Sequence, residues 1–362
     1  MRFENQGFDH VEFILNDITA SAAMYKRMGF EKIGERTATA KGTRTEVWAQ
    51  GFVRILLTQP IAGNKAAESQ ESVKFLRAQD EGVCVLAVDV ADPAAAFRET
   101  VAKGAKPAME PKTYETPEGR VTRAEIWTPG LVRYAFISRA AKPGQQTPGL
   151  FDEGLVVSRF ESPSPFGIRV IDHLTNNVSI GEMKKWVDWY HKIFDFKIIR
   201  HFDIKTGRTG LVSDAVQSQD GKITVPVNEA TEPESQVQEF VTRFKGPGVQ
   251  HLAFLTTDIQ HTVGNLKRVD FSFLTVPHTY YEVVPTRVKG VTEDLKKLED
   301  LSILLDSEGE GYLLQIFTAE ILGPFFFEFI QRKGNKGFGE GNFRALFEAI
   351  ERDQIKRGTL TA

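Results

Sequence analysis

Glu328 stands in an aromatic stretch, with phenylalanines at positions 325–327 and at position 329. A carboxylate in apolar surroundings is costly unless it pairs, takes up a proton or binds a metal. The chain also carries His173 and His251, each inside a strand-like run of its own. Two imidazoles and one carboxylate, with coordination positions left open, are the ligand set of non-haem Fe(II) sites that handle dioxygen. We therefore predict that these three residues hold one metal ion.

Each of the three residues also has a simpler structural interpretation. A single histidine in a strand is more often a core residue than a ligand. Glu328 has Arg332 and Arg139 as alternative ion-pair partners, and zinc accepts the same ligands as iron. Four further histidines lack an equivalent strand context and are predicted to be surface or core residues: His191, His201, His261 and His278.

Strand periodicity favours a common site for the three candidate ligands. Alternation over residues 249–256 puts His251 and Ala253 on one face, and alternation over residues 325–332 puts Phe326 and Glu328 on one face. Strands that return to one curved sheet can bring such inward faces together.

The elements that position these residues belong to two copies of one plan. A Pro-, Gly- and Ser-rich connection over residues 142–167 separates the copies. Three short matches recur in the same order: residues 9–13 with 172–176, residues 82–88 with 248–254, and residues 135–139 with 328–332. Such ordered similarity indicates a duplicated unit. We expect an N-terminal domain over residues 1–155 without a metal site and a C-terminal catalytic domain over residues 156–362.

The repeat also acts as an internal control on the metal prediction. Where the C-terminal copy has its three candidate ligands, the N-terminal copy has His10, Val85 and Ala135. One half can therefore build a metal site, whereas the other keeps the framework without two of the ligands. The C-terminal half is longer around residues 279–306, which predicts an inserted segment there.

Composition excludes several classes of protein. The 362-residue chain has a net charge of -3 and no long basic block, so a nucleic-acid partner is not expected. The single cysteine, Cys84, lies in an apolar run and is predicted to be a buried, inert thiol. The sequence has no apolar signal core and no stretch long enough to span a bilayer, so we expect a soluble cytoplasmic protein without a membrane partner.

Five segments carry a family resemblance: residues 172–175, 248–254, 313–317, 323–334 and 337–343. They strongly resemble 4-hydroxyphenylpyruvate dioxygenases over essentially the whole C-terminal half, and the N-terminal half matches in general plan. That family belongs to the vicinal oxygen chelate superfamily. The resemblance implies an α+β fold of two tandem vicinal-oxygen-chelate domains, each of paired βαβββ modules that form an open barrel, plus a C-terminal helix.

The resemblance also implies roles for individual residues. His173, His251 and Glu328 would bind Fe(II), one ion per chain. A polar network around the substrate would comprise Ser213, Asn228, Gln236, Gln250 and Gln315, although alternation points Gln250 away from the face of His251. The pocket wall and its aromatic lining would comprise Pro226, Phe317, Phe326, Phe338, Phe343 and Phe347.

The last helix shows one apolar stripe made by Phe343, Phe347 and Ile350. Ordinary core packing explains this stripe as well as a pocket lining does. The resemblance suggests that the helix caps the cavity as a gate.

The function that the resemblance implies is conversion of 4-hydroxyphenylpyruvate and O2 to homogentisate and CO2 in tyrosine catabolism, by a homodimer or homotetramer. Two alternatives stay open. 4-Hydroxymandelate synthase uses the same substrate and metal but oxidises the benzylic carbon, and a non-catalytic ligand-binding protein can share the fold. An extradiol catechol dioxygenase also shares the fold and ligand types but requires a catechol.

Overall fold

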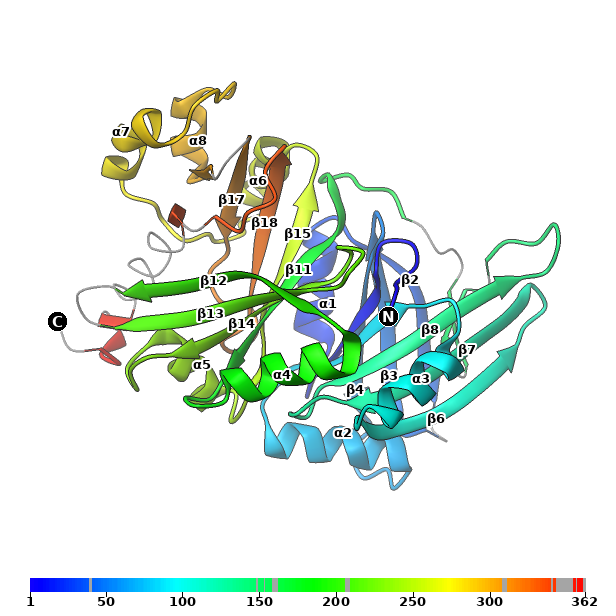
Figure 1. Ribbon diagram of the computed structural model, residues 1–362. Coiled ribbons are helices and arrows are strands. Elements are labelled where there is room, and N and C mark those ends of the chain that lie inside the picture. Colours follow the sequence, from blue (N-terminus) through cyan, green and yellow to red (C-terminus); the bar gives the residue numbers. More distant parts are fainter. Residues whose placement is uncertain are drawn as a thin grey trace.

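The structure is a computed structural model that describes the chain except for residues 39–40, 148, 153, 158–161, 206–208, 308–310, 340, 343–353, 356 and 361–362. Two curled eight-stranded sheets lie side by side, with helices packed against them (Figure 1). The final helix expected from residue 343 onward, with Phe343 and Phe347, falls mainly outside the described residues.

The N-terminal sheet is built from the first eight strands. They are β1 (Phe8–Ile14), β2 (Glu31–Ala38), β3 (Thr43–Gln50), β4 (Val53–Pro60), β5 (Gly82–Asp89), β6 (Lys106–Glu115), β7 (Gly119–Trp127) and β8 (Arg133–Ala141). Their order across the sheet is β2-β3-β4-β1-β5-β8-β7-β6. A short hairpin of β9 (Leu150–Asp152) and β10 (Leu155–Val156) follows and contacts β7 and β2 of this sheet.

The C-terminal sheet repeats this order strand for strand. Its strands are β11 (Ile168–Val178), β12 (Lys197–Lys205), β13 (Gly210–Gln217), β14 (Thr224–Ala230), β15 (Gly248–Thr256), β16 (Leu304–Asp306), β17 (Tyr312–Phe317) and β18 (Phe326–Lys333). They are arranged as β12-β13-β14-β11-β15-β18-β17-β16. The duplication predicted from the three sequence matches is therefore confirmed at the level of topology.

The helices complete two βαβββ modules in each half, as expected. The helices are α1 (Thr19–Arg27), α2 (Ala67–Ala78), α3 (Pro93–Ala102), α4 (Met183–Phe194), α5 (Gln236–Arg243), α6 (Ile259–Arg268), α7 (His278–Arg287) and α8 (Leu295–Leu301). Helices α7 and α8 form the insertion predicted around residues 279–306. No helix in the described part of the chain is long and apolar enough to cross a membrane.

Equivalent helices begin with equivalent caps. The side chain of Asp92 accepts a hydrogen bond from the amide of Ala95 at the start of α3, and Asp258 accepts one from His261 at the start of α6, both at 3.0 Å. An aspartate at this position satisfies an amide that the helix itself leaves without a partner. The local sequence thus fixes where the helix after each central strand begins.

The main core lies between the two halves. Tyr25 of α1 packs edge-on against Phe327 of β18, and Tyr190 of α4 packs edge-on against Tyr134 of β8. Phe327 and Phe329 are fully buried. Because side chains alternate along a strand, Glu328 between them points to the opposite face of the sheet. One face of β18 therefore supplies the core, and the other supplies the candidate metal centre.

Phe244, which follows α5, packs against both halves at once. A Cβ atom added to Gly82 of β5 would lie 2.5 Å from its ring, and one added to Gly248 of β15 would also overlap it. The ring has little freedom to retreat, because it also packs against Phe75 and Phe240. The two glycines therefore admit the ring between the central strands of the two sheets.

We expect Gly82→Ala and Gly248→Ala each to destabilise the protein by about 1–3 kcal/mol, because the added methyl group overpacks the contact with Phe244. Gly264→Ala in α6 is the matched control, since no atom lies within 4 Å of its added methyl group. That control should gain about 0.5–1 kcal/mol from helix propensity. Urea unfolding of the three variants measures the difference, and equal effects at all three positions would contradict the packing argument.

Candidate metal centre

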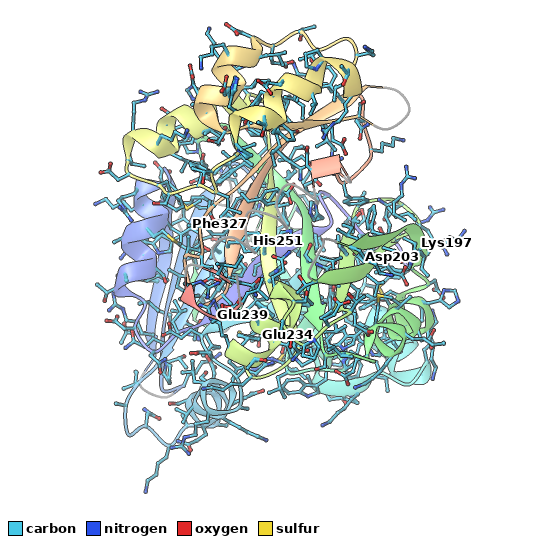
Figure 2. All side chains as sticks on the ribbon, turned by 90° about the vertical axis from the view of Figure 1, so that its left-hand side faces the viewer. Lys197, Asp203, Glu234, Glu239, His251 and Phe327 are labelled. Atoms are coloured by element: carbon cyan, nitrogen blue, oxygen red, sulfur yellow. The ribbon has the colours of Figure 1, made fainter. Side chains whose placement is uncertain are left out.

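Strand register brings the three predicted ligands to one face of the C-terminal sheet. His173 on β11 lies opposite Ala253 on β15, and Ala253 lies opposite Glu328 on β18. His251 precedes Ala253 by two residues and therefore points to the same face. Figure 2 shows His251 in the interior of the molecule, whereas Lys197 and Asp203 lie at its edge. The methyl group of Ala253 leaves space between the two flanking ligands.

The spacing of the ligand atoms fits one metal ion. Nε2 of His173 lies 3.3 Å from Oε2 of Glu328, and Nε2 of His251 lies 3.5 Å from the same oxygen. All three ligand atoms lie within 4.8 Å of one another. Ligands at right angles around an ion with bonds of about 2.1 Å are about 3 Å apart, so small side-chain movements suffice. The side chains of His173, His251 and Glu328 are 4%, 6% and 2% exposed.

The electrostatics of the site keep Glu328 ionised. Burial would raise the pKa of this carboxyl, but the imidazoles of His173 and His251 hold the pKa below its ordinary value. Burial would lower the pKa of His173, but the carboxylates of Glu328 and Asp172 raise it to about 9. For His251, burial is the largest influence and lowers the pKa. Glu328 thus supplies a carboxylate ligand of the kind that a divalent cation prefers.

A β-bulge lets Asp172 orient His173. The register between β11 and β15 shifts between Ile171 and His173, so Asp172 is an extra residue in the strand. Its Oδ2 lies 2.8 Å from Nδ1 of His173, the ring nitrogen that points away from Glu328. Such a contact fixes the ring orientation and leaves Nε2 for the metal. We did not predict this role of Asp172.

Arg332 holds Asp172 in turn. Its guanidinium donates two hydrogen bonds to the carboxylate of Asp172, at 2.8 and 2.7 Å. It also donates to the carbonyl oxygen of Gly337 at 2.6 Å. The two arginines considered as ion-pair partners of Glu328 bind aspartates instead. Arg332 pairs with Asp172, and Arg139 pairs with Asp9. Arg332 connects the candidate ligand His173 to the loop that carries Phe338, whose ring lies edge-on to His173 at 5.6 Å.

His251 is held between an amide and two aromatic rings. Oε1 of Gln250 lies 3.2 Å from Nδ1 of His251, which is the nitrogen that faces away from Glu328. Phe326 stacks on the imidazole with ring centroids 4.8 Å apart, and Phe317 lies edge-on at 6.4 Å. The structure thus places Gln250 behind the ring, in contact with His251.

A chain of hydrogen bonds leads from Glu328 to the inserted helix α7. Nε2 of Gln315 donates to Oε1 of Glu328 at 3.4 Å, and Asn342 donates to Oε1 of Gln315 at 3.2 Å. The hydroxyl of Tyr280 on α7 donates to Asn342 at 2.6 Å. Gln315 was predicted as part of a polar network, whereas Asn342 and Tyr280 were not. Every member of this chain is buried.

The remaining predicted pocket residues lie on neighbouring elements. Ser213 on β13 pairs in register with Asn228 on β14, and Asn228 pairs with Asn177 on β11. The hydroxyl of Ser213 is buried and has no hydrogen-bond partner among the described residues. Pro226 is buried two residues before Asn228, and Gln236 is the first residue of α5. Their contact with a substrate stays a prediction.

The N-terminal half repeats the outer contacts of the site without the ligands. His10 pairs in register with Ala87, and Ala87 pairs with Ala135, which reproduces the line from His173 to Glu328. Asp9 is again the bulged residue; it binds Nδ1 of His10 at 2.5 Å and also binds Arg139. Val85 stands at the place of His251. The predicted equivalence of the two halves is thus confirmed residue by residue.

Asp172→Asn should lower metal affinity about 10- to 100-fold, because the partner that orients His173 is weakened. Asp9→Asn disturbs the equivalent contact in the N-terminal half and should leave metal affinity unchanged. Competitive titration with Co²⁺ measures both. Equal losses of affinity in the two variants would show that the effect comes from general destabilisation and not from the orientation of His173.

His10 should make stability depend on pH. Burial lowers its pKa to about 4, whereas the unfolded chain titrates near 6.5. Between these values the unfolded state binds more protons, so the free energy of unfolding falls as pH falls through this window. By about pH 5 the loss is about 2 kcal/mol. Urea unfolding at about pH 7.5 and pH 5 should show a smaller pH dependence for His10→Gln than for the wild type.

Known proteins similar to this chain agree with the site. Residues 3–120 match the family described as "Hydroxyphenylpyruvate dioxygenase, HPPD, N-terminal", and residues 170–283 match the "Glyoxalase/Bleomycin resistance protein/Dioxygenase superfamily". In three dimensions the chain is similar to a triple mutant of 4-hydroxymandelate synthase from Streptomyces coelicolor, with a TM-score of 0.83, 25% identity, and coverage of 96% of this chain and 98% of that one.

Three relatives are each 38% identical to this chain, and each alignment covers 98% of this chain and 96% of the relative. They are hemolysin VllY of Vibrio vulnificus (strain CMCP6), and the 4-hydroxyphenylpyruvate dioxygenases of Legionella pneumophila (strain Corby) and Pseudomonas aeruginosa (strain PAO1). Both the relatives and the buried His-His-Glu cluster support a metal cofactor. The chain belongs to the 4-hydroxyphenylpyruvate dioxygenase family of the vicinal oxygen chelate superfamily.

Proposed function

We propose that this protein is an Fe(II)-dependent dioxygenase that converts 4-hydroxyphenylpyruvate and O2 to homogentisate and CO2, in tyrosine breakdown. The observation that carries the proposal is the convergence of His173, His251 and Glu328 in a chain whose relatives bear this name. Among the residues that the structure describes, this cluster offers three ligand atoms, so a bound metal ion would keep coordination positions for a bidentate 2-oxo acid and for dioxygen.

We assign the metal to the three ligands, one Fe(II) per chain. When bound, iron(II) supplies the oxygen activation that amino-acid side chains cannot perform. Glu328 contributes a permanent negative charge, because its pKa is held below the ordinary value. Asp172 and Gln250 contact the outer nitrogens of His173 and His251, so both rings present Nε2 to the centre.

The surrounding side chains would bind and shield the substrate. Phe317, Phe326 and Phe338 are buried around the two imidazoles and keep water from the reacting atoms. Gln315 holds Glu328 on one side and is itself held by Asn342, so its amide has a fixed direction. We propose that polar groups on the neighbouring strands and α5 bind the substrate's oxygens. These are Ser213, Asn228 and Gln236, with Pro226 shaping the wall.

4-Hydroxymandelate synthase is the second candidate function, and the structural similarity to that enzyme favours it specifically. Both reactions consume the same 2-oxo acid and differ in which carbon is oxidised. The names of the similar sequences favour the first candidate. A non-catalytic ligand-binding protein is less compatible with an intact ligand set.

Further expectations from the sequence are part of the same proposal. We propose two domains that divide near residue 155, where the β9–β10 hairpin still contacts the N-terminal sheet. We propose a cytoplasmic homodimer or homotetramer. Light scattering coupled to size-exclusion chromatography decides between the two assemblies. The gating role of residues 343–362, with Phe343 and Phe347, concerns a segment that lies mainly outside the described residues.

Fe(II) and 4-hydroxyphenylpyruvate without oxygen should give a weak visible charge-transfer band, and admission of air should then give homogentisate. Glu328→Ala should lose both the band and turnover, because a carboxylate ligand and its charge are removed together. Glu35→Ala, at an exposed glutamate of the N-terminal half, should retain both. Formation of 4-hydroxymandelate would assign the second function, and full turnover by Glu328→Ala would overturn the ligand assignment.

A further inference from the structure

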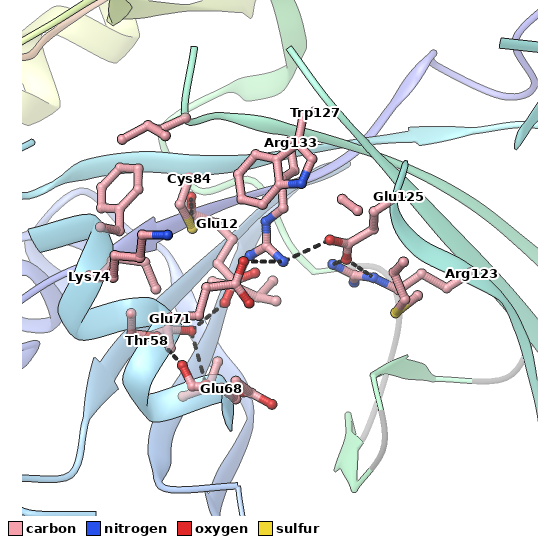
Figure 3. A pocket seen from close by; sticks show the side chains of 18 of the residues that line it. Glu12, Thr58, Glu68, Glu71, Lys74, Cys84, Arg123, Glu125, Trp127 and Arg133 are labelled. Atoms are coloured by element: carbon pink, nitrogen blue, oxygen red, sulfur yellow. Dashed lines mark hydrogen bonds and ion pairs between the residues drawn. The ribbon is translucent and has the colours of Figure 1, made fainter. Parts of the chain in front are cut away.

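A cavity of about 940 Å³ lies in the N-terminal half, away from the metal centre. Strands β1, β3, β4, β5, β7 and β8 and helix α2 all contribute lining residues, among them Glu12, Thr45, Arg123 and Arg133. This volume lies within the range of ligand-binding pockets. Figure 3 shows Glu12, Glu125 and Arg133 turned toward the same space. The chemistry described so far uses none of these residues.

Strand register shows that this cavity occupies the place of the proposed substrate pocket in the other half. Thr45 pairs with Thr58 across β3 and β4, just as Ser213 pairs with Asn228 across β13 and β14. Both threonines line the cavity, and their hydroxyls are 2.9 Å apart. The N-terminal half has therefore kept the pocket although it lacks the metal ligands.

At two positions the wall of this cavity carries a charged side chain where the C-terminal half has an uncharged one. Ile137 of β8 corresponds to Ile330 of β18, because Ala135 corresponds to Glu328. Arg123 pairs with Ile137 and Gln315 pairs with Ile330, so the arginine stands where the other half has glutamine. By the same register Glu125 stands at the place of Phe317. The guanidinium of Arg123 lies 3.4 Å from Nε2 of His10, the nitrogen that corresponds to the metal-facing atom of His173. A cationic side chain thus takes the side of the imidazole where the other half would hold its metal.

Two arginines share one carboxylate inside the cavity. Nε of Arg123 donates to Oε1 of Glu125 at 2.8 Å, and Nη1 of Arg133 donates to Oε2 of the same side chain at 2.8 Å (Figure 3). Arg123 and Glu125 are 5% and 3% exposed. The triad therefore keeps one positive charge in excess. Glu71 lies 3.8 Å from Arg133, but its side chain is 47% exposed and screened by solvent.

The whole lining is more basic than the protein that surrounds it. Seven basic and four acidic side chains line the cavity, whereas the complete chain has a net charge of -3. Lys74 and Lys106 are exposed residues of this lining. Glu12 also lies in this lining, and burial raises its pKa, although Arg123 and Arg133 lower it. A hollow with an excess of one sign of charge attracts small ions of the opposite sign.

Apolar side chains form another part of the wall. Ile14, Leu56, Phe75 and Trp127 line the cavity together with the charged groups. The guanidinium of Arg133 lies over the ring of Trp127, 5.7 Å from its centroid, which leaves its edge for hydrogen bonds. The described residues contain no second cluster of metal-ligating side chains here. The lining therefore fits an organic anion and not a metal ion.

From this arrangement we propose that the N-terminal cavity binds a small organic carboxylate with an apolar body, independently of the metal centre. The carboxylate would lie against the Arg123–Glu125–Arg133 triad and the basic lining, and the apolar body would contact Trp127 and Phe75. This site is separate from the proposed function, and its occupancy does not depend on iron.

Calorimetric titration of the metal-free protein with 2-naphthoate tests the proposal. We expect saturable binding that weakens at least 10-fold in Arg133→Gln. The charge-reversed double variant Lys74→Glu/Lys106→Glu, at two exposed positions that do not threaten folding, should also weaken binding at least 10-fold. Lys184→Gln, which removes an exposed positive charge from α4, is the matched control and should bind as the wild type does. Neutral 2-naphthamide should bind at least 10-fold more weakly than the acid.

The metal-centre pocket is an alternative site for the same probe. Glu328→Gln and Phe326→Ala alter that pocket and should leave the binding of 2-naphthoate unchanged. Binding that is lost in these two variants and kept in the Lys74→Glu/Lys106→Glu variant would overturn the proposal. Equal binding of acid and amide, or no saturable binding to the wild type, would also overturn it and leave the triad a purely structural feature.

Discussion

The pairing of Ala253 with His173 on one side and Glu328 on the other is the constraint on which the metal centre depends. A shift of one residue in either pairing would point the side chain of a ligand toward the core between the two halves. The opposite faces of the same strands prevent such a shift, because Phe254, Phe327 and Phe329 are fully buried there. The geometry of the site is therefore set by hydrophobic packing on the face that does no chemistry.

The contact of an aspartate with a histidine and an arginine is a property of the fold and not of the metal site alone. It occurs around His173 with Asp172 and Arg332, and again around His10, where the described residues form no metal-ligand cluster. In both halves the aspartate is the extra residue of a β-bulge. The ion pair satisfies a carboxylate that the bulge turns inward, and the orientation of the imidazole is a consequence that the C-terminal half can use.

The sequence alone was sufficient for the duplicated plan, the three candidate ligands and the position of the insertion. These features rest on local patterns: an acid among phenylalanines, alternation in strands, and matches that recur in order. The contacts of Asp172 and Arg332 were not predicted, although an aspartate precedes the histidine in both repeats and an arginine ends the third match in both. The contact between Asp172 and Arg332 depends on a β-bulge and on the placement of β11 and β18 on either side of β15. A local sequence pattern predicts neither the bulge nor this strand order. Gln315 was predicted from the family resemblance, but its correspondence to Arg123 was not, because β7 and β17 lie outside the three segments that recur in the two halves.

The two halves show how one backbone can carry either an aromatic or a charged side chain at the same place in the wall. In the C-terminal half the rings of Phe317 and Phe326 pack against His251, so this side of the candidate metal centre is apolar. In the other half Glu125 stands at the place of Phe317, and a buried carboxylate there demands cationic partners, which Arg123 and Arg133 supply. Once such a triad is present, a metal ion beside His10 would be repelled by the guanidinium of Arg123. The pair of side chains on β7 thus makes this pocket basic and, together with Val85 and Ala135 in place of two ligands, disfavours a metal ion beside His10.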